Sequence, residues 1–254
     1  MRVVIIGSGN VATILGQKIL QASHEIMQVW SRNNTHASEL ARMLNAAPTE
    51  DLSRLADADL YIIAVSDAAV AAVSKQLSVT DRVVVHTAGS VSIHALDDCS
   101  NHTGVLYPLQ SIRKERDAGI PIPLLIDGNN DHSLRVIQEL ARSLSHDVRI
   151  VQDEPRLKLH VAAVVLNNFL NHLYTLTTDY CNKMDLDFQL LMPLITETAE
   201  RLEFIRPHDA QTGPAVRNDY TTIDKHLALL KDDKDLYELY KLFSEKIGAY
   251  YARS

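Results

Sequence analysis

The sequence predicts an α/β fold, in which a mostly parallel sheet is followed by an all-helical region, and three observations carry this prediction. Short apolar runs alternate with amphipathic stretches as far as Ile150, which is typical of repeated strand–helix units. A glycine-rich turn joins the first apolar run to the first amphipathic stretch. After Val151 the apolar residues recur at helical spacing.

The strands and helices of the first region follow from these patterns in chain order. Continuous apolar and β-branched runs indicate buried strands, and they lie at 3–6, 26–30, 60–66, 82–89, 104–109, 123–128 and 148–151. Helices are expected at 10–22, 36–46, 67–77 and 131–145, where apolar residues share one face. Because strands and helices alternate, we expect right-handed crossovers and a mostly parallel sheet.

Four helices are expected after Val151. The first covers 155–184, with Pro155 suited to its first turn, and the second covers 188–205. An irregular loop, TGPAVRND at 212–219, precedes helices at 220–231 and 235–251. The change of pattern predicts two domains, at 1–152 and 153–254, each of ordinary domain size.

The composition restricts the class of protein. The net charge is −7, and the sequence gives no sign of the clustered basic face that nucleic-acid binding requires. No apolar run approaches the ~20 residues that span a bilayer, and the early VVIIG run is too short for a signal peptide. Cys99 and Cys181 lack metal-ligand spacing and form either a disulfide or, as we favour, a reduced cytosolic pair. We expect a cytoplasmic protein without a metal site, nucleic-acid partner or membrane span.

The glycine-rich turn has the context of a dinucleotide-binding fingerprint, since it follows a strand and opens a helix. Gly7 permits the tight turn, Gly9 lets a pyrophosphate approach the backbone, and Ala12 is small enough for close helix–strand packing. The backbone N–H groups of Ser8, Asn10 and Val11 would then face the phosphates. The turn therefore predicts a Rossmann-type domain with a bound dinucleotide; the alternative is a glycine turn in an empty α/β domain.

The end of the second strand indicates which dinucleotide binds. An NAD site usually places Asp or Glu there, but this segment reads Ser31-Arg32-Asn33. Ser31 can hydrogen-bond a 2′-phosphate and Arg32 can pair with it, so we expect NADP; alternatively, Arg32 is a solvated loop residue. Two further strand ends should border the cofactor, and they supply Val65, Ser66, Thr87, Ala88 and Gly89. Asp67 is expected to cap the next helix rather than to touch the cofactor.

Six segments, in order over nearly the whole chain, resemble one protein family: GSGNVA, VWSRN, DLYIIAVSDAAV, VVVHTAGSVS, LYPLQSI and TGPAVRNDYTTIDKHLALL. That family of NADP oxidoreductases joins a Rossmann-like NADP-binding domain to a helical domain of unassigned function (DUF2520). It is similar to F420-dependent NADP reductases and pyrroline-5-carboxylate reductases, and more distantly to 6-phosphogluconate and β-hydroxyacid dehydrogenases. The motifs of the first domain identify the cofactor, whereas the TGPAVRND loop is more specific to this family.

The resemblance implies an oxidoreductase that uses NADP and forms a homodimer through its helical domain. A helical domain of this size hardly buries enough apolar surface by itself, which favours the same dimer. Three departures bear on the chemistry. Tyr107-Pro108 stands where members often have His-Pro, Thr87-Ala88-Gly89 stands where they have Ser-Gly-Ala, and the Lys-x-x-x-Asn spacing of the dehydrogenases is absent, since Ala162 follows Lys158 by four.

Polar residues within the first predicted helix of the second domain are candidates for catalysis. His160 is the favoured titratable group, and Asn167 or Asn168 would orient the substrate, because an α-helix places the three roughly on one side. Tyr107, directly after the fifth strand, is a second candidate proton donor. The alternatives are a structural His–Asn pair within the helices and a packed tyrosine.

The TGPAVRND loop is the other candidate site. Arg217 can clamp a carboxylate or phosphate of the substrate, with Thr212 beside it, and Asp219 either holds Arg217 or caps the next helix. An ordinary interhelical turn with a local ion pair is the alternative. We expect hydride transfer between NADP(H) and a small carbonyl, imine or F420-like substrate bound between the domains; the competing hypothesis is a non-catalytic NADP(H)-binding sensor or interaction protein.

Overall fold

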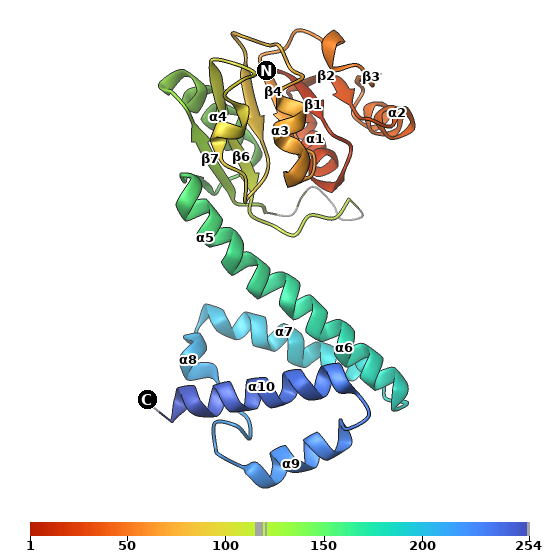
Figure 1. The fold of residues 1–254 in the computed structure, drawn as a ribbon, viewed down its shortest axis with the longest axis vertical. Helices are drawn as coiled ribbons and strands as arrows, with labels where there is room; N and C mark the ends of the chain where they lie inside the picture. The colour runs from red at the N-terminus through yellow and green to blue at the C-terminus, as the bar shows by residue number, and fades with distance from the viewer. Residues whose placement is uncertain (115–118, 120, 253–254) are drawn as a thin grey trace. The chain divides into compact units, whose positions relative to one another are not determined.

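The computed structural model describes residues 1–114, 119 and 121–252 (Figure 1). Its internal contacts divide the chain into two units, Met1–Asn167 and Asn168–Ser254. The first unit holds a mixed sheet with its helices, and the second unit is helical in the residues that are described. The division into a nucleotide domain at 1–152 and a substrate and dimerisation domain at 153–254 is a functional one, and it stays a prediction.

One eight-stranded sheet forms the centre of the first unit, and it confirms the predicted fold class. Its strands are β1 (Arg2–Ile6), β2 (Glu25–Trp30), β3 (Ala47–Thr49), β4 (Leu60–Ile63), β5 (Val83–His86), β6 (His102–Pro108), β7 (Leu124–Gly128) and β8 (Val148–Ile150). They lie in the order β3-β2-β1-β4-β5-β6-β7-β8, and all neighbours are parallel except the pair β6 and β7. The sequence pattern did not predict β3, which is a three-residue strand at the edge of the sheet. Its central residue is Pro48, and proline is accepted in a sheet mainly at an edge.

Helices cover both faces of the sheet because the apolar side chains of each strand alternate. Val3 and Ile5 of β1 share a core with α1 (Asn10–Gln21), α2 (Asn34–Met43) and α4 (Asp131–Leu144). Val4 and Ile6 point to the other face, where they pack with α3 (Val70–Ser74) and the 3₁₀ helix η3 (Ile93–Leu96). The helix expected at 67–77 is shorter, since it begins as the 3₁₀ turn η2 (Asp67–Ala69) and α3 ends at Ser74. A further short turn is η1 (Leu52–Arg54).

The helix expected at 155–184 contains an unforeseen segment. It begins as α5 (Asp153–Ala163), passes through the π-helical segment η4 (Val164–Phe169) and continues as α6 (Leu170–Lys183). A π-helix bonds i to i+5, so the wheel that placed His160 and the two asparagines on one side does not apply across η4. Hydrophobic periodicity missed this turn because it reports which residues are apolar, not which carbonyl each N–H reaches.

The rest of the second unit follows the predicted order with shorter helices. The stretch expected at 188–205 divides into η5 (Phe188–Leu191), α7 (Met192–Glu200) and η6 (Arg201–Glu203), and Pro193 lies in the first turn of α7. The short helix α8 (Pro207–Ala210) was not predicted. Helices α9 (Tyr220–Leu229) and α10 (Lys234–Tyr251) lie where they were expected.

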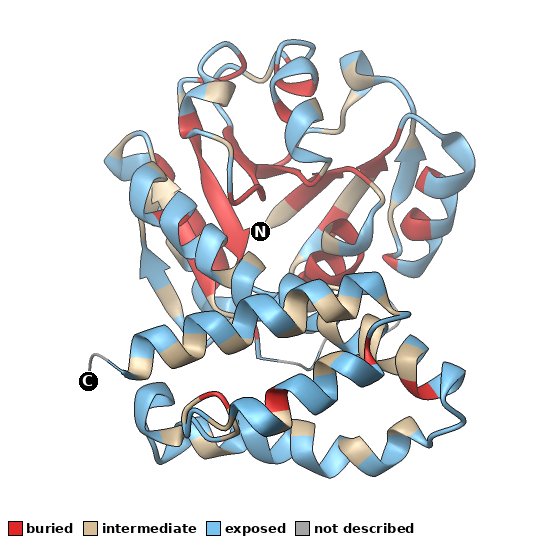
Figure 2. Ribbon diagram, turned by 60° about the horizontal axis from the view of Figure 1, so that its bottom comes forward, coloured by how far each residue is buried: buried red, intermediate tan, exposed pale blue. Residues whose placement is uncertain are grey.

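The two units differ in how far they bury their apolar residues (Figure 2). Buried side chains line both faces of the sheet, whereas the described part of the second unit buries only Cys181, Ala215, Ile223 and Leu230. Apart from Met43 and Ile150, every large exposed apolar side chain of the described chain lies between Leu157 and Tyr250. The described helical part therefore packs few of its apolar side chains into a core of its own.

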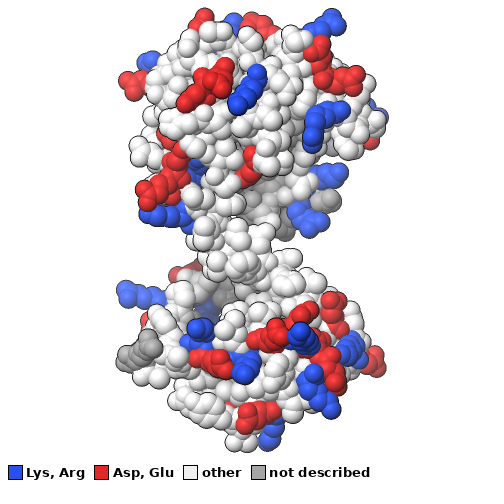
Figure 3. All heavy atoms as spheres, in the orientation of Figure 1, with Lys and Arg blue, Asp and Glu red and all other residues white. Residues whose placement is uncertain are grey.

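Charge and composition add little to this picture. Acidic and basic side chains intermix on the face shown in Figure 3. Within the described ranges no helix is long and apolar enough to cross a membrane, and no group of His, Cys, Asp or Glu is arranged to hold a metal ion. Cys99 and Cys181 are free and buried, so the disulfide left open above is not formed.

Candidate functional site

The glycine turn between β1 and α1 has the backbone that the fingerprint requires. Gly7 has a φ of +133°, and its N–H donates to the Trp30 carbonyl at 2.8 Å. A Cβ on Gly7 would lie 2.1 Å from the Ala64 carbonyl oxygen, so no other residue fits without moving the backbone that directly follows β4. A Cβ on Gly9 would meet nothing within 4 Å, so the space above it is open. Ala12 is fully buried in the core, as its packing role predicts.

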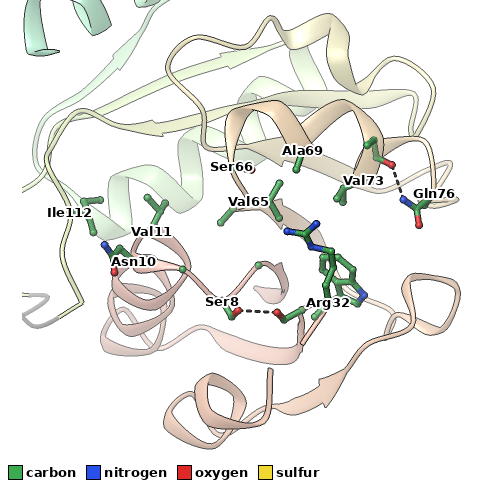
Figure 4. Close-up of a pocket in the computed structure, with 16 residues that line it drawn as sticks. Ser8, Asn10, Val11, Arg32, Val65, Ser66, Ala69, Val73, Gln76 and Ile112 are labelled. Atoms are coloured by element: carbon green, nitrogen blue, oxygen red, sulfur yellow. Dashed lines mark hydrogen bonds between the residues drawn. The ribbon is translucent and has the colours of Figure 1, made fainter. Parts of the chain in front are cut away.

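A cavity of about 600 Å³ lies over this turn (Figure 4). Nine of the residues expected to bind the cofactor line it: Gly7, Ser8, Gly9, Asn10, Val11, Ser31, Arg32, Val65 and Ser66. The sequence reasoning missed Trp30, Ala64 and Ile112, and also one wall from the η2–α3 segment, with Ala69, Ala72, Val73 and Gln76. The spacing of that wall (i, i+3, i+4, i+7) is a helical face, which predicts a helix at 67–77 but does not show that the face lines a cavity.

The end of β2 contributes polar side chains to the wall of the cavity. The hydroxyl of Ser8 donates to Oγ of Ser31 at 2.9 Å, which joins the glycine turn to the strand end. The exposed side chain of Arg32 points into the cavity from there (Figure 4). Asn33 lies outside the cavity wall, where its side chain caps α2 by accepting from the N–H of His36 at 3.2 Å.

These residues fit a dinucleotide with an extra phosphate. The volume lies within the range of ~300–1,000 Å³ that is usual for small-molecule sites. The N-terminus of α1 has neither a side-chain cap nor an acidic residue in its first turn, which leaves its N–H groups and its dipole to an anion. Because Ser31 and Arg32 replace the usual acid at the end of β2, the cavity also suits a 2′-phosphate.

A second polar cluster joins three segments of the first unit. Tyr107 of β6 and His160 of α5 form a hydrogen bond of 3.0 Å between the phenol oxygen and Nδ1. Their rings meet edge to face, with centroids 5.9 Å apart. A Cβ on Gly89, which follows β5, would lie 2.7 Å from both His160 Nδ1 and Tyr107 Cζ. Both catalytic candidates of the first unit are thus brought together, although neither pattern predicted their pairing.

The Tyr107 hydroxyl is held in its protonated form. Burial raises the pKa of Tyr107 above its ordinary value of 10; the negative charge of Asp67 adds to the shift and the positive charge of Arg156 opposes it. The His160 ring is half-buried, so protons reach it from solvent. A neutral phenol with a half-exposed imidazole behind it can give a proton to a substrate and regain one.

Two expectations concern the ends of β4 and β5, and the one for Asp67 is wrong. Asp67 does not cap a helix; its carboxylate accepts from the hydroxyl of Ser90, and Ser66 takes the N-cap position. Thr87 and Ala88 are buried between β5 and Gly89 and do not line the 600 Å³ cavity. Gly89 at this strand end packs against the Tyr107–His160 pair, and contact of Thr87, Ala88 or Gly89 with the cofactor stays a prediction.

The candidates later in the sequence are more exposed. Asn167 and Asn168 lie in η4 with exposed side chains. Asp219 caps α9, since it accepts from the N–H of Thr222 at 3.0 Å and from its hydroxyl at 2.7 Å. Thr212 and Arg217 are exposed, and the ion pairs of the described residues do not include one between Arg217 and Asp219. Of the two roles left open for Asp219, the structure shows capping.

Two family descriptions match the chain. "NADP oxidoreductase coenzyme F420-dependent" covers residues 2–89, which hold the glycine turn and Gly89. "Domain of unknown function (DUF2520)" covers residues 122–247. No curated protein matches the sequence.

Solved structures resemble the chain over nearly its whole length. A "putative NADP oxidoreductase" from Bacteroides fragilis is 36% identical, with a TM-score of 0.91 and 98% of each chain covered. A reductive aminase from Aspergillus terreus, solved with NADPH and ethyl-5-oxohexanoate, is 16% identical, with a TM-score of 0.73 over 96% of this chain and 92% of that one. A 1-pyrroline-5-carboxylate reductase from Streptococcus pyogenes is 14% identical, with a TM-score of 0.66 and 98% of each chain covered. The last two share the fold.

Proposed function

Because the chain belongs to the NADP oxidoreductase family, whose cofactor is NADP, we propose that it reduces a small carbonyl or imine with NADPH and that Tyr107 supplies the proton. The observation that carries the proposal is the hydrogen bond between the Tyr107 hydroxyl and His160 Nδ1 beside Gly89. The imine class is supported by the fold shared with a reductive aminase and a pyrroline-5-carboxylate reductase.

The chemistry assigns a task to each residue. When bound, NADPH would supply a hydride, that is, two electrons and a proton, to the carbon of the C=O or C=N bond. The heteroatom then needs a proton, and the neutral Tyr107 phenol donates it. His160 returns a proton to the Tyr107 oxygen through Nδ1 and is recharged from solvent at its half-exposed ring. The product is the alcohol or amine, and both side chains regain their starting state.

The cofactor preference rests on the end of β2. Arg32 would pair with the 2′-phosphate through its fork of donors, and the Ser8–Ser31 bond holds the strand end beside the glycine turn. The chain has a single tryptophan, Trp30, which lines the same cavity. Quenching of Trp30 fluorescence therefore measures cofactor binding without any turnover.

The helical region is proposed to bind a second copy of the chain. Its most exposed apolar side chains include Phe204 at 83%, Leu190 at 77% and Leu166 at 70% exposure. The number of large apolar side chains left exposed in this region favours an interface. A homodimer through the helical region covers them. The free cysteines, buried as they are, agree with action in the reducing cytoplasm.

The test is NADPH oxidation against a panel of small keto acids, aldehydes, cyclic and linear imines, and oxidised F420. We expect turnover with one class, and a fall in kcat of roughly 10²–10⁴-fold in Tyr107→Phe with the NADPH Kd unchanged. Tyr240→Phe, which removes the hydroxyl of a different tyrosine–histidine pair, that of Tyr240 with His226, is the matched control. Tight NADPH binding without turnover on any class would instead favour a sensor, and full activity in Tyr107→Phe would exclude Tyr107 as the donor.

A further inference from the structure

A buried arginine lies one helical turn before His160. Arg156 is only 1% exposed, and its Nη2 donates to the Val91 carbonyl at 2.5 Å and to Asp153 Oδ1 at 2.7 Å. Its Nε and Nη1 are buried without a partner among the described residues. A buried guanidinium that is only partly paired is costly to keep, so its position in the first turns of α5 calls for an explanation.

Asp153 completes the attachment of α5 to a loop. Its carboxylate accepts from the Ser92 hydroxyl at 2.5 Å and from the Ile93 N–H at 3.2 Å. The segment Val91–Ile93 is thereby bound to the start of α5 by a carbonyl, a hydroxyl and an N–H. This set of contacts, made by Arg156 and Asp153 with Val91–Ile93, is called the α5 anchor below.

Both parts of the α5 anchor, the loop and the start of α5, lie close in sequence to residues that form or contact the Tyr107–His160 pair. Val91 follows Gly89 by two residues, and Gly89 is the residue against which His160 and Tyr107 pack. His160 follows Arg156 by four residues on an uninterrupted α-helix, which places both side chains on one face. A shift of the first turns of α5 against Val91–Ile93 would therefore move His160 Nδ1 away from the Tyr107 oxygen.

We propose that Arg156 is a positioning residue, which with Asp153 and Ser92 fixes α5 so that His160 stays hydrogen-bonded to Tyr107. Its consequence for turnover rests on the proposed function, whereas the His160–Tyr107 geometry can be measured in a protein that turns nothing over. Electrostatics agree with the placement, because the Arg156 charge reaches both Tyr107 and the buried His86, and it opposes the rise in the pKa of Tyr107.

The experiment observes the His160 ring directly. Nitrogen-15 NMR of the histidine side chains in the full chain with bound NADPH reports the hydrogen bond at Nδ1, and the Tyr107→Phe variant gives the signal of a broken bond. We expect Arg156→Met to move the His160 signal to that of Tyr107→Phe, and Arg156→Lys to restore it in part, since an ammonium can still donate to Val91 and Asp153. Arg149→Met, at an exposed pair with Asp147 on β8, is the control and should leave the signal unchanged.

Milder variants decide the matter if Arg156→Met fails to fold. Asp153→Asn and Ser92→Ala each weaken the α5 anchor and should shift the same signal, by a smaller amount. With a substrate in hand, Arg156→Met should lower kcat about 10–100-fold, with KM and the Kd from Trp30 quenching changed less than about threefold. Wild-type His160 signals in all anchor variants would overturn the proposal, even where Tyr107→Phe abolishes turnover; absent turnover would overturn only the proposed function.

Discussion

The two units of the chain bury their apolar residues to very different degrees. In Met1–Asn167 the strand side chains pack on both faces of the sheet, and the cofactor cavity and the Tyr107–His160 pair are complete within that unit. In the described part of Asn168–Ser254 four residues are buried while many Leu, Phe and Tyr side chains stay exposed. We infer that the first unit binds its cofactor without help, whereas the second unit needs a partner surface.

The largest expected effect tests the inference that the second unit needs a partner surface. Leu190→Asp combined with Phe204→Asp places charges on the two most exposed large apolar side chains of the described helical region. If the double substitution costs the dimer about 4 kcal/mol in total, the dimer Kd rises roughly 10³-fold, which sedimentation at micromolar concentration measures.

Two results control that experiment. Met43→Asp, at an exposed position on α2 of the first unit, should leave the dimer intact. A wild-type protein that sediments only as a monomer at micromolar concentration would refute the dimer altogether. Trp30 quenching should show that the NADPH affinity of the double variant is close to that of the wild type.

The next effect tests the inference that the first unit binds the cofactor, and it concerns the glycine turn. Gly7→Ala forces a Cβ to 2.1 Å from a carbonyl oxygen at a φ of +133°, so we expect a stability loss of about 3 kcal/mol and loss of NADPH binding. Gly9→Ala is the matched control, since its Cβ meets nothing in the protein. It should keep the stability within about 1 kcal/mol and still weaken NADPH binding, because it fills the space left for the pyrophosphate. Urea unfolding and Trp30 quenching measure the two effects, and normal binding by both variants would place the cofactor elsewhere.

The stability of the first unit should depend on pH through His86. Burial, with help from the Arg156 charge, lowers the pKa of His86 from 6.5 to about 4. Since the unfolded chain binds this proton more readily, the contribution is complete above pH 6.5 and is lost as the pH falls toward 4, by about 3 kcal/mol. Urea unfolding across this range should show a smaller loss in His86→Leu than in wild type. His94→Gln, at an exposed histidine, should retain the wild-type slope, and an equal slope in His86→Leu would contradict the prediction.

The smallest effect concerns the choice of cofactor. Arg32→Ala removes one charge-assisted contact to the 2′-phosphate, which is worth about 1.5–3 kcal/mol. The preference for NADPH over NADH in Trp30 quenching should therefore fall about 10–100-fold, with the NADH Kd unchanged. Arg54→Ala, at an exposed residue that does not line the cavity, is the control. An unchanged preference in Arg32→Ala would assign the arginine to solvent.

Features that depend on neighbouring residues in the chain were predictable. The strand, the glycine turn and the first helix follow one another directly, so residue types alone indicated the phosphate site. Ser31 and Arg32 end the next strand, and the absence of an acid there indicated NADP. The wall of the cavity from α3 was harder, because small residues at helical spacing serve a ligand and a core equally well.

The Tyr107–His160 pair could not be derived from the sequence, because its members are 53 positions apart and each has an ordinary structural role available. The role of Asp219 stayed open for the same reason, since a carboxylate before a helix can cap it or bind an arginine. The π-helical turn at Val164–Phe169 depends on hydrogen-bond partners, to which an apolar pattern is blind.

The sequence by itself thus determined the α/β class, the glycine turn and the kind of cofactor, since these depend on local backbone preferences and on residues that end adjacent strands. The tertiary structure decided which side chains meet. It placed Tyr107 against His160 beside Gly89, and it fixed α5 to Val91–Ile93 through a buried Arg156. The physical reason is that packing across the sheet, and not spacing along the chain, brings distant polar groups within hydrogen-bonding distance.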